Sequence, residues 1–194
     1  MNARAASTQE PSQDSPGLVL DLLAIAPSML GGIALRGLPG PGRDAVLNRL
    51  SAVMDPPVRV PVNVSEERLL GGLDIASTLR ARRPVYERGL LEMAHKRLLV
   101  LSMAERLESH FVGLICQAMD AQQLIVERDG RSGRTDCSPV VVALDESLED
   151  DEHLAPALAD RLAFSLATDD LGRASPGDSV VTPDTLADVR QRFA

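Results

Sequence analysis

The chain has 194 residues, of which 44% are hydrophobic and 25% charged, and this is the composition of a globular protein with one full domain. Its net charge of -8 and its 2% aromatic content argue against a nucleic-acid partner, which needs clustered basic side chains and stacking surfaces. The two cysteines lack a CxxC partner and the three histidines lie in no ligand spacing, so we expect no metal site and a reducing, cytoplasmic setting.

The N-terminal part of the chain combines a polar tail with an apolar stretch. Residues 1–16 lack the apolar segment of a signal peptide, and we predict a disordered tail there. Apolar residues then follow helical spacing over Leu18–Ala26, and a short apolar run at Gly32–Arg36 predicts a buried strand. Because Asp21 and Pro27 interrupt this stretch, we interpret it as helix, turn and strand, and expect no transmembrane segment.

Helix and strand patterns alternate over the rest of the chain, which predicts an α/β fold with a mainly parallel sheet flanked by helices. A helix is expected from Val46 to Met54, and Leu70–Asp74 is expected to be a loop. The acidic stretch Asp145–Glu152 is interpreted as a solvated loop rather than a Mg²⁺ or partner site. The other predicted elements are strands at Val58–Val62, Leu98–Leu101, Val140–Leu144 and Phe164–Leu166, helices beginning at Ser65 and Thr182 and covering Val112–Met119 and Leu154–Arg161, and a hairpin of Leu124–Arg128 with Arg134–Ser138.

A glycine-rich loop between the first strand and the second helix is the main candidate site. Gly37, Gly40, Gly42, Arg43 and Asp44 follow the spacing G-x-x-x-x-G-K-[ST] of a phosphate-binding loop, although the last two positions differ from it. Such a loop binds phosphate through backbone N–H groups and the positive end of the following helix. The alternative is an ordinary Gly/Pro turn between a strand and a helix.

The residues that would carry hydrolysis depart from the pattern. Arg43 replaces the lysine that reaches the phosphates, and the single lysine of the chain, Lys96, lies outside the loop. Asp44 replaces the hydroxyl residue that holds Mg²⁺, and places a carboxylate beside the phosphates. We therefore expect ATP and Mg²⁺ to bind weakly or not at all in this loop, and binding without hydrolysis stays open.

The acidic residues that should follow the Leu98–Leu101 strand are also missing. In nucleotidases with this loop such residues hold Mg²⁺ and polarise the attacking water. Here Ser102-Met103 stands at that place, and Glu105 is displaced from it by two or three residues. We interpret Glu105 as a solvated surface carboxylate, and expect no ATP hydrolysis by this chain.

Several further stretches, taken in order with the loop, make the chain resemble the AAA+ module of the magnesium chelatases, which insert Mg²⁺ into protoporphyrin IX. The resemblance runs from about Leu18 to Leu166 and is most specific in its GGLD, ERGLL and VERDG blocks. The matching stretches are the glycine-rich loop, Leu70–Asp74, Arg83–Leu91, Leu98–Leu101, Ile125–Gly130 and Leu154–Arg161.

Within this family the chain is similar to the D subunit, whose ATPase motifs are degraded, rather than to the active ATPase subunit. The resemblance implies a three-layer P-loop NTPase core of the AAA+ type with β-hairpin insertions. It also implies an ATPase-inactive platform that assembles in a homo- or hetero-oligomeric ring with the ATPase subunit and the porphyrin-binding large subunit in (bacterio)chlorophyll biosynthesis. Arg161 lies in a stretch that resembles the family's arginine finger, a catalytic residue that acts in trans; its alternative role is to complement the dipole of its own helix.

Two alternatives of other classes remain at this point. One is a competent ATP-hydrolysing AAA+ protein that uses Arg43 and Asp44 in an unusual loop, and the other is a diverged AAA+ protein-binding module. For the domain organisation we predict a tail at 1–16, the AAA+-like core at 17–170, and a linker with the start of the helical lid at 171–194. Because the lid only begins at Thr182, we expect the chain to be part of a longer protein.

Overall fold

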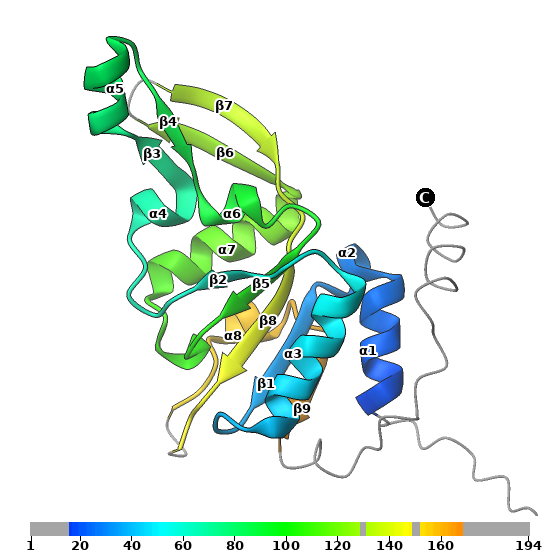
Figure 1. Cartoon of the computed structure of the whole chain (residues 1–194). Coiled ribbons are helices and arrows are strands. Elements are labelled where there is room, and N and C mark those ends of the chain that lie inside the picture. Colours follow the sequence, from blue (N-terminus) through cyan, green and yellow to red (C-terminus); the bar gives the residue numbers. More distant parts are fainter. Residues whose placement is uncertain (1–15, 129–130, 149–151, 169–194) are drawn as a thin grey trace, which may run out of the picture.

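The computed structural model of the chain describes residues 16–128, 131–148 and 152–168 (Figure 1). The predicted N-terminal tail, apart from its last residue, and the predicted helix from Thr182 lie outside these residues. The division into tail, core and start of the lid therefore stays a prediction.

A five-stranded sheet with the order β2-β5-β8-β1-β9 forms the centre of the described part, and all its pairings are parallel. Near-continuous apolar runs form these strands because helices cover both faces of the sheet. All four residues of β5 and all six of β8 are buried. The bounds are Val58–Val60 for β2, Leu98–Leu101 for β5, Val140–Asp145 for β8, Gly32–Arg36 for β1 and Phe164–Ala167 for β9.

The two faces of the sheet carry separate hydrophobic clusters, which gives the predicted three layers. On one face, Leu23 of α1 and Leu50 of α3 pack with Leu98 of β5. On the other, Ile115 of α7 packs with Leu99, the next residue of the same strand. The helices of the first face are α1 at Pro16–Ile25 and α3 at Pro41–Val53, and those of the second include α4 at Glu66–Leu70, α6 at Leu90–Met93, α7 at Ser109–Ala121 and α8 at Pro156–Ala159.

Two antiparallel hairpins extend from the core at the same end of the molecule (Figure 1). The first corrects the sequence prediction, because Leu70–Asp74 is not a loop. Its residues Gly71–Leu73 form β3, which pairs with β4 at Tyr86–Arg88, and α5 at Ile75–Ala81 lies between them. Gly71 and Gly89 permit this pairing. A Cβ on Gly71 would collide with the Glu87 carbonyl oxygen, and a Cβ on Gly89 would meet the backbone of Leu69, Leu70 and Gly71. The prediction failed because such short glycine-containing strands carry no apolar alternation.

The second hairpin confirms its prediction, although the bounds of both strands differ from the predicted ones. β6 covers Gln123–Arg128 and β7 covers Arg131–Asp136, so the second strand begins three residues earlier than expected. Two other elements are shorter than predicted. β2 ends before Pro61, which has no N–H to donate, and α8 is four residues long. The short elements α2 at Pro27–Leu30, α6 at Leu90–Met93 and η1 at Ala104–Arg106 were not predicted.

Both cysteines are buried in the core, and this predicts their reactivity. Cys137 has no exposed surface and its thiol donates to the Leu91 carbonyl at 3.2 Å, while Cys116 is 5% exposed. Burial raises the pKa of the Cys137 thiol to about 11 and also raises the pKa of Cys116. We expect neither thiol of the folded chain to react with a chromogenic disulfide reagent at pH 7.5, and two to react after denaturation in urea. Rapid labelling of one thiol before denaturation would contradict this packing.

Candidate functional site

The glycine-rich loop lies where the sequence places it, at the carboxyl edge of the sheet between β1 and α3 (Figure 1). Gly37 has a φ of 133°, a value that favours glycine, and its N–H donates to the Asp145 carbonyl at 2.8 Å. A Cβ at this position would collide with the hydroxyl of Thr168. The first glycine of the loop is therefore required by the turn and by its neighbour.

The second half of the loop opens α3. Gly40 is the N-cap in an extended conformation, Pro41 takes the first helical position, and the Asp44 N–H donates to the Gly40 carbonyl at 3.1 Å. Gly42 and Arg43 belong to the first helical turn. Asp44 is exposed in this turn, where a carboxylate interacts favourably with the positive end of the helix. The structure thus confirms the strand–loop–helix context of the five residues.

Arg43 does not face solvent as a free phosphate ligand. Its Nη1 donates to Oε1 of Glu146 at 2.6 Å, and the two side chains are only 11% and 21% exposed. Glu146 lies directly after β8, so this ion pair joins the start of α3 to the end of the neighbouring strand. The cation of the loop is therefore already neutralised by a carboxylate of the same chain.

Glu105 belongs to the same site, which corrects its interpretation as a solvated surface carboxylate. Its side chain is fully buried, and its Oε2 accepts a hydrogen bond from the Glu146 N–H at 3.1 Å. The left-handed backbone of Met103, with φ of 48°, begins the turn η1 that brings this side chain back to the sheet. Sequence spacing could not show this, because the turn changes direction within three residues of the strand. Ser102 and Met103, at the expected acidic positions, supply no carboxylate.

The acidic stretch that begins with Asp145, the last residue of β8, is also only partly a solvated loop. Asp145 is 6% exposed and its Oδ1 accepts from the Ser147 N–H at 3.1 Å and from the Ser147 hydroxyl. Glu152 pairs with Arg106 at 3.3 Å near the surface. Residues 149–151 lie outside the described part. Within residues 16–128, 131–148 and 152–168, no three Asp, Glu, His or Cys side chains converge as metal ligands.

Arg161 is not brought to the loop. Its Nε and Nη2 donate to the two carboxylate oxygens of Asp120 at 2.8 and 2.6 Å, and its Nη1 donates to the Ala157 carbonyl of α8 at 2.6 Å. The hydrogen bond from Arg161 holds the pKa of the Asp120 carboxyl below its usual value. The side chain is 32% exposed, so a bidentate pair with its own chain occupies an accessible arginine.

The backbone of Arg161 lies at the amino edge of the sheet, opposite the carboxyl edge that carries the glycine-rich loop. Its carbonyl lies so close to Gly31 that a Cβ there would collide with it, and the Ala163 N–H donates to the Leu30 carbonyl at 3.1 Å. Gly31 precedes β1 and the glycine-rich loop follows it, so the five residues of β1, about 16 Å of strand, separate the two sites. Arg161 therefore cannot serve the loop of its own chain.

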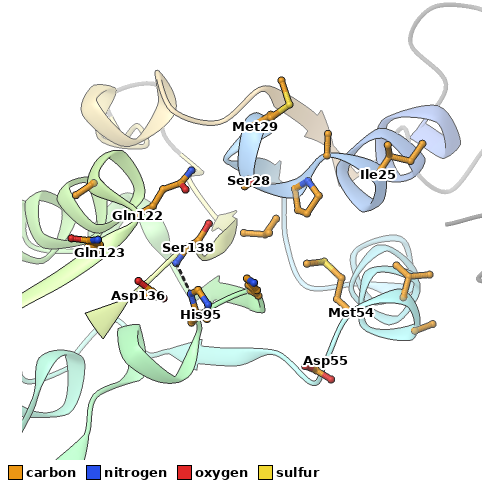
Figure 2. A pocket seen from close by; sticks show the side chains of 17 residues that line it. Ile25, Ser28, Met29, Met54, Asp55, His95, Gln122, Gln123, Asp136 and Ser138 are labelled. Carbon is orange, nitrogen blue, oxygen red and sulfur yellow. Dashed lines mark hydrogen bonds between the residues drawn. The ribbon is translucent and has the colours of Figure 1, made fainter. Parts of the chain in front are cut away.

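A large cavity of about 1240 Å³ lies at this same amino edge, not at the loop (Figure 2). Ser28 and Met29 line it on the side of α2, Met54 at the end of α3, and His95 and Ser138 near the starts of β5 and β8. The Ser138 N–H donates to Nδ1 of the His95 ring at 3.3 Å, between two of the lining residues. None of the candidate loop residues lines it.

Comparisons with known proteins identify related subunits. The chain is 35% identical over 175 residues to the magnesium-chelatase 60 kDa subunit of Cereibacter sphaeroides, covering 90% of the chain and 28% of that protein. It is 37% identical over 116 residues to the 67 kDa subunit of Chlorobaculum parvum, covering 58% and 19%. It is 35% identical over 111 residues to the 38 kDa subunit of Rhodobacter capsulatus, covering 57% and 31%. The chain thus spans about a fifth to a third of these relatives.

Solved structures agree with the fold. A model of the complex between subunits BchI and BchD of magnesium chelatase matches with a TM-score of 0.64 and 26% identity, over 94% of this chain and 64% of that chain. A putative ATPase from Cytophaga hutchinsonii matches with a TM-score of 0.60 and 16% identity, over 91% and 57%. No protein-family model matches the chain. None of the helices within the described residues is long and apolar enough to cross a membrane.

Proposed function

From the premise that this chain is an AAA+ module related to the magnesium-chelatase subunits, we propose that it is a platform module of the D type that does not hydrolyse ATP. It assembles with the ATPase subunit and the porphyrin-binding large subunit, in a ring, in the cytoplasm. There it couples ATP hydrolysis by its partner to Mg²⁺ insertion into protoporphyrin IX in (bacterio)chlorophyll biosynthesis. The similarity to the 60 kDa subunit covers 90% of the chain, against 57% for the 38 kDa subunit, and this supports the D type.

The observation that supports the proposed absence of ATP hydrolysis is the ion pair between Arg43 and Glu146. Hydrolysis requires a cation free to bind the phosphates and a carboxylate that holds Mg²⁺ beside them. Here the loop cation is bound to a carboxylate of its own chain, and Ser102 and Met103 stand after β5. The positive end of α3 remains at the loop as a structural feature that this chain shares with phosphate-binding sites.

The edge that carries Arg161 supports assembly. This arginine is accessible and lies about 16 Å of strand away from its own loop, so the place for an arginine that acts on phosphate is a neighbouring subunit. Such an arginine stabilises the charge that develops on a transferred phosphoryl group. To act in this way it must exchange Asp120 for the phosphate of the neighbour.

Turnover and assembly test the proposal together. We expect the isolated chain to release no phosphate from Mg-ATP above the level of an Arg43→Ala control, because the loop lacks a free cation and a Mg²⁺ ligand. When mixed with a chelatase ATPase subunit, it should form a complex in sedimentation velocity experiments. Mg-dependent turnover that the Arg43→Ala change abolishes would favour the competent hydrolase instead. Absence of a complex with the ATPase subunit would favour a diverged module with other partners.

A further inference from the structure

One side chain joins the three segments that leave the carboxyl edge of the sheet beside the glycine-rich loop. The Glu146 carboxylate accepts from Arg43 at 2.6 Å, at the start of α3. The backbone N–H of the same residue donates to Glu105 at 3.1 Å, in the turn after β5. Glu146 itself follows β8. The segments after β1, β5 and β8 are therefore connected without any added ligand.

The Arg43 guanidinium has more N–H donors than its hydrogen bond to Glu146 uses. Its side chain is only 11% exposed, and its Nε is buried without a hydrogen-bond partner among the described residues. A guanidinium binds a carboxylate or a phosphate through the same pattern of parallel N–H donors. Glu146 accepts from Nη1, and Nε on the other side of the guanidinium has no partner among the described residues, so the site offers an oxoanion a donor that Glu146 does not occupy.

An incoming phosphate would have to displace Glu146. That carboxylate would then lose its cation while lying next to the buried Glu105, whose Oε1 has no hydrogen bond within the described residues and lies 3.4 Å from Nε of Arg106. Two carboxylates close together in a partly buried site, beside a third anion, repel one another. Displacement is therefore unfavourable as long as Glu146 keeps its charge.

We propose that Glu146 is a built-in anion of the glycine-rich loop, and that its carboxylate takes the place of a ligand phosphate on Arg43. The loop is then occupied in the absence of nucleotide, and its three segments stay joined whatever the nucleotide state of a neighbouring subunit. This goes beyond the absence of hydrolysis, because it states that the loop retains an oxoanion site that one neutral substitution opens. It rests on the loop alone and not on assembly with a partner.

The test uses the 194-residue chain, with inorganic pyrophosphate as the probe in isothermal titration calorimetry. The wild-type chain should show no saturable binding at millimolar pyrophosphate. Glu146→Gln keeps the shape of the side chain and removes its charge, and it should bind pyrophosphate saturably, at least about tenfold more tightly than the weakest binding that the wild-type titration could detect. Adding Arg43→Gln to that variant should remove the binding. The matched control Glu152→Gln, which neutralises the surface partner of Arg106, should behave as the wild type.

The outcomes separate the inference from the proposed function. Saturable binding by the wild type with the affinity of Glu146→Gln would overturn it, and so would a folded Glu146→Gln chain that binds no better than the wild type. If Glu146→Gln fails to fold, Glu146→Asp replaces it, because it keeps the charge but shortens the reach to Arg43. Tighter binding by that variant than by the wild type supports the inference, and equal binding overturns it. None of these results depends on whether the chain assembles with a chelatase subunit.

Discussion

If Arg161 acts in trans as proposed, replacing it with alanine should lower ATP hydrolysis by about 10³-fold in a mixed complex with a chelatase ATPase subunit. The reason is that the transferred phosphoryl group would lose a guanidinium that neutralises its charge. Arg161→Lys keeps the charge but not the planar fork, so it should recover only part of the rate. The measurement is phosphate release per assembled complex, with assembly checked by sedimentation.

The structure also supplies the control for this experiment. Asp120→Asn removes the carboxylate that binds Arg161 within the chain but leaves the arginine in place. If Arg161 works in trans, this variant should hydrolyse ATP in the complex at the wild-type rate or faster, because the arginine is released more easily. If Arg161 only joins α8 to α7, both variants should weaken the isolated chain alike and leave the hydrolysis rate of the complex unchanged.

Gly32→Ala should destabilise the chain by about 3 kcal/mol or more, a large part of the stability of a typical domain. Gly32 has a φ of 155°, and a Cβ there would collide with the Val141 carbonyl oxygen and lie 2.7 Å from its carbon. These are backbone atoms in the pairing between β1 and β8, which cannot move aside as a flexible side chain can. Urea unfolding followed by circular dichroism measures the loss.

The matched control for this substitution is Gly113→Ala. Gly113 lies within α7, and a Cβ on it would meet nothing within 4 Å. Alanine should therefore raise the stability by about 0.5–1 kcal/mol, because it restricts the unfolded chain and favours the helix. If both substitutions change the midpoint in the same direction and by similar amounts, the close contact between Gly32 and Val141 is not a constraint on the fold.

Much of the sheet follows from local sequence alone. The strands β1 and β5 have the predicted bounds, because strands buried on both faces consist of continuous apolar residues. The predicted helix start at Ser65 is confirmed by its side chain, which accepts from the Arg68 N–H at 3.3 Å. A similar signal was present for the missed helix α5, since Asp74 caps it by accepting from the Ser77 N–H at 2.9 Å.

The candidate site was predictable only in its contiguous part. The spacing of Gly37, Gly40 and Gly42 located the loop, but the partner of Arg43 is 103 residues away in sequence. Glu105 and Glu146 join that loop through a reversal of the chain after β5 and through the order of strands in the sheet. Such contacts depend on tertiary packing, which residue spacing does not encode.

The strand β1 gives the module two chemically different edges, with the loop after Arg36 and the Arg161 backbone beside Gly31. An interface that brings Arg161 of one subunit to the loop of another therefore joins unlike surfaces. In a two-fold dimer the patch that faces itself would have to include both edges, because Arg161 of each subunit must then reach the loop of the other. Where the two edges belong to separate patches, the subunits are related by a head-to-tail rotation, and the assembly ends only when that rotation closes a circle. The direction of a single strand thus determines which two surfaces such an assembly has to join.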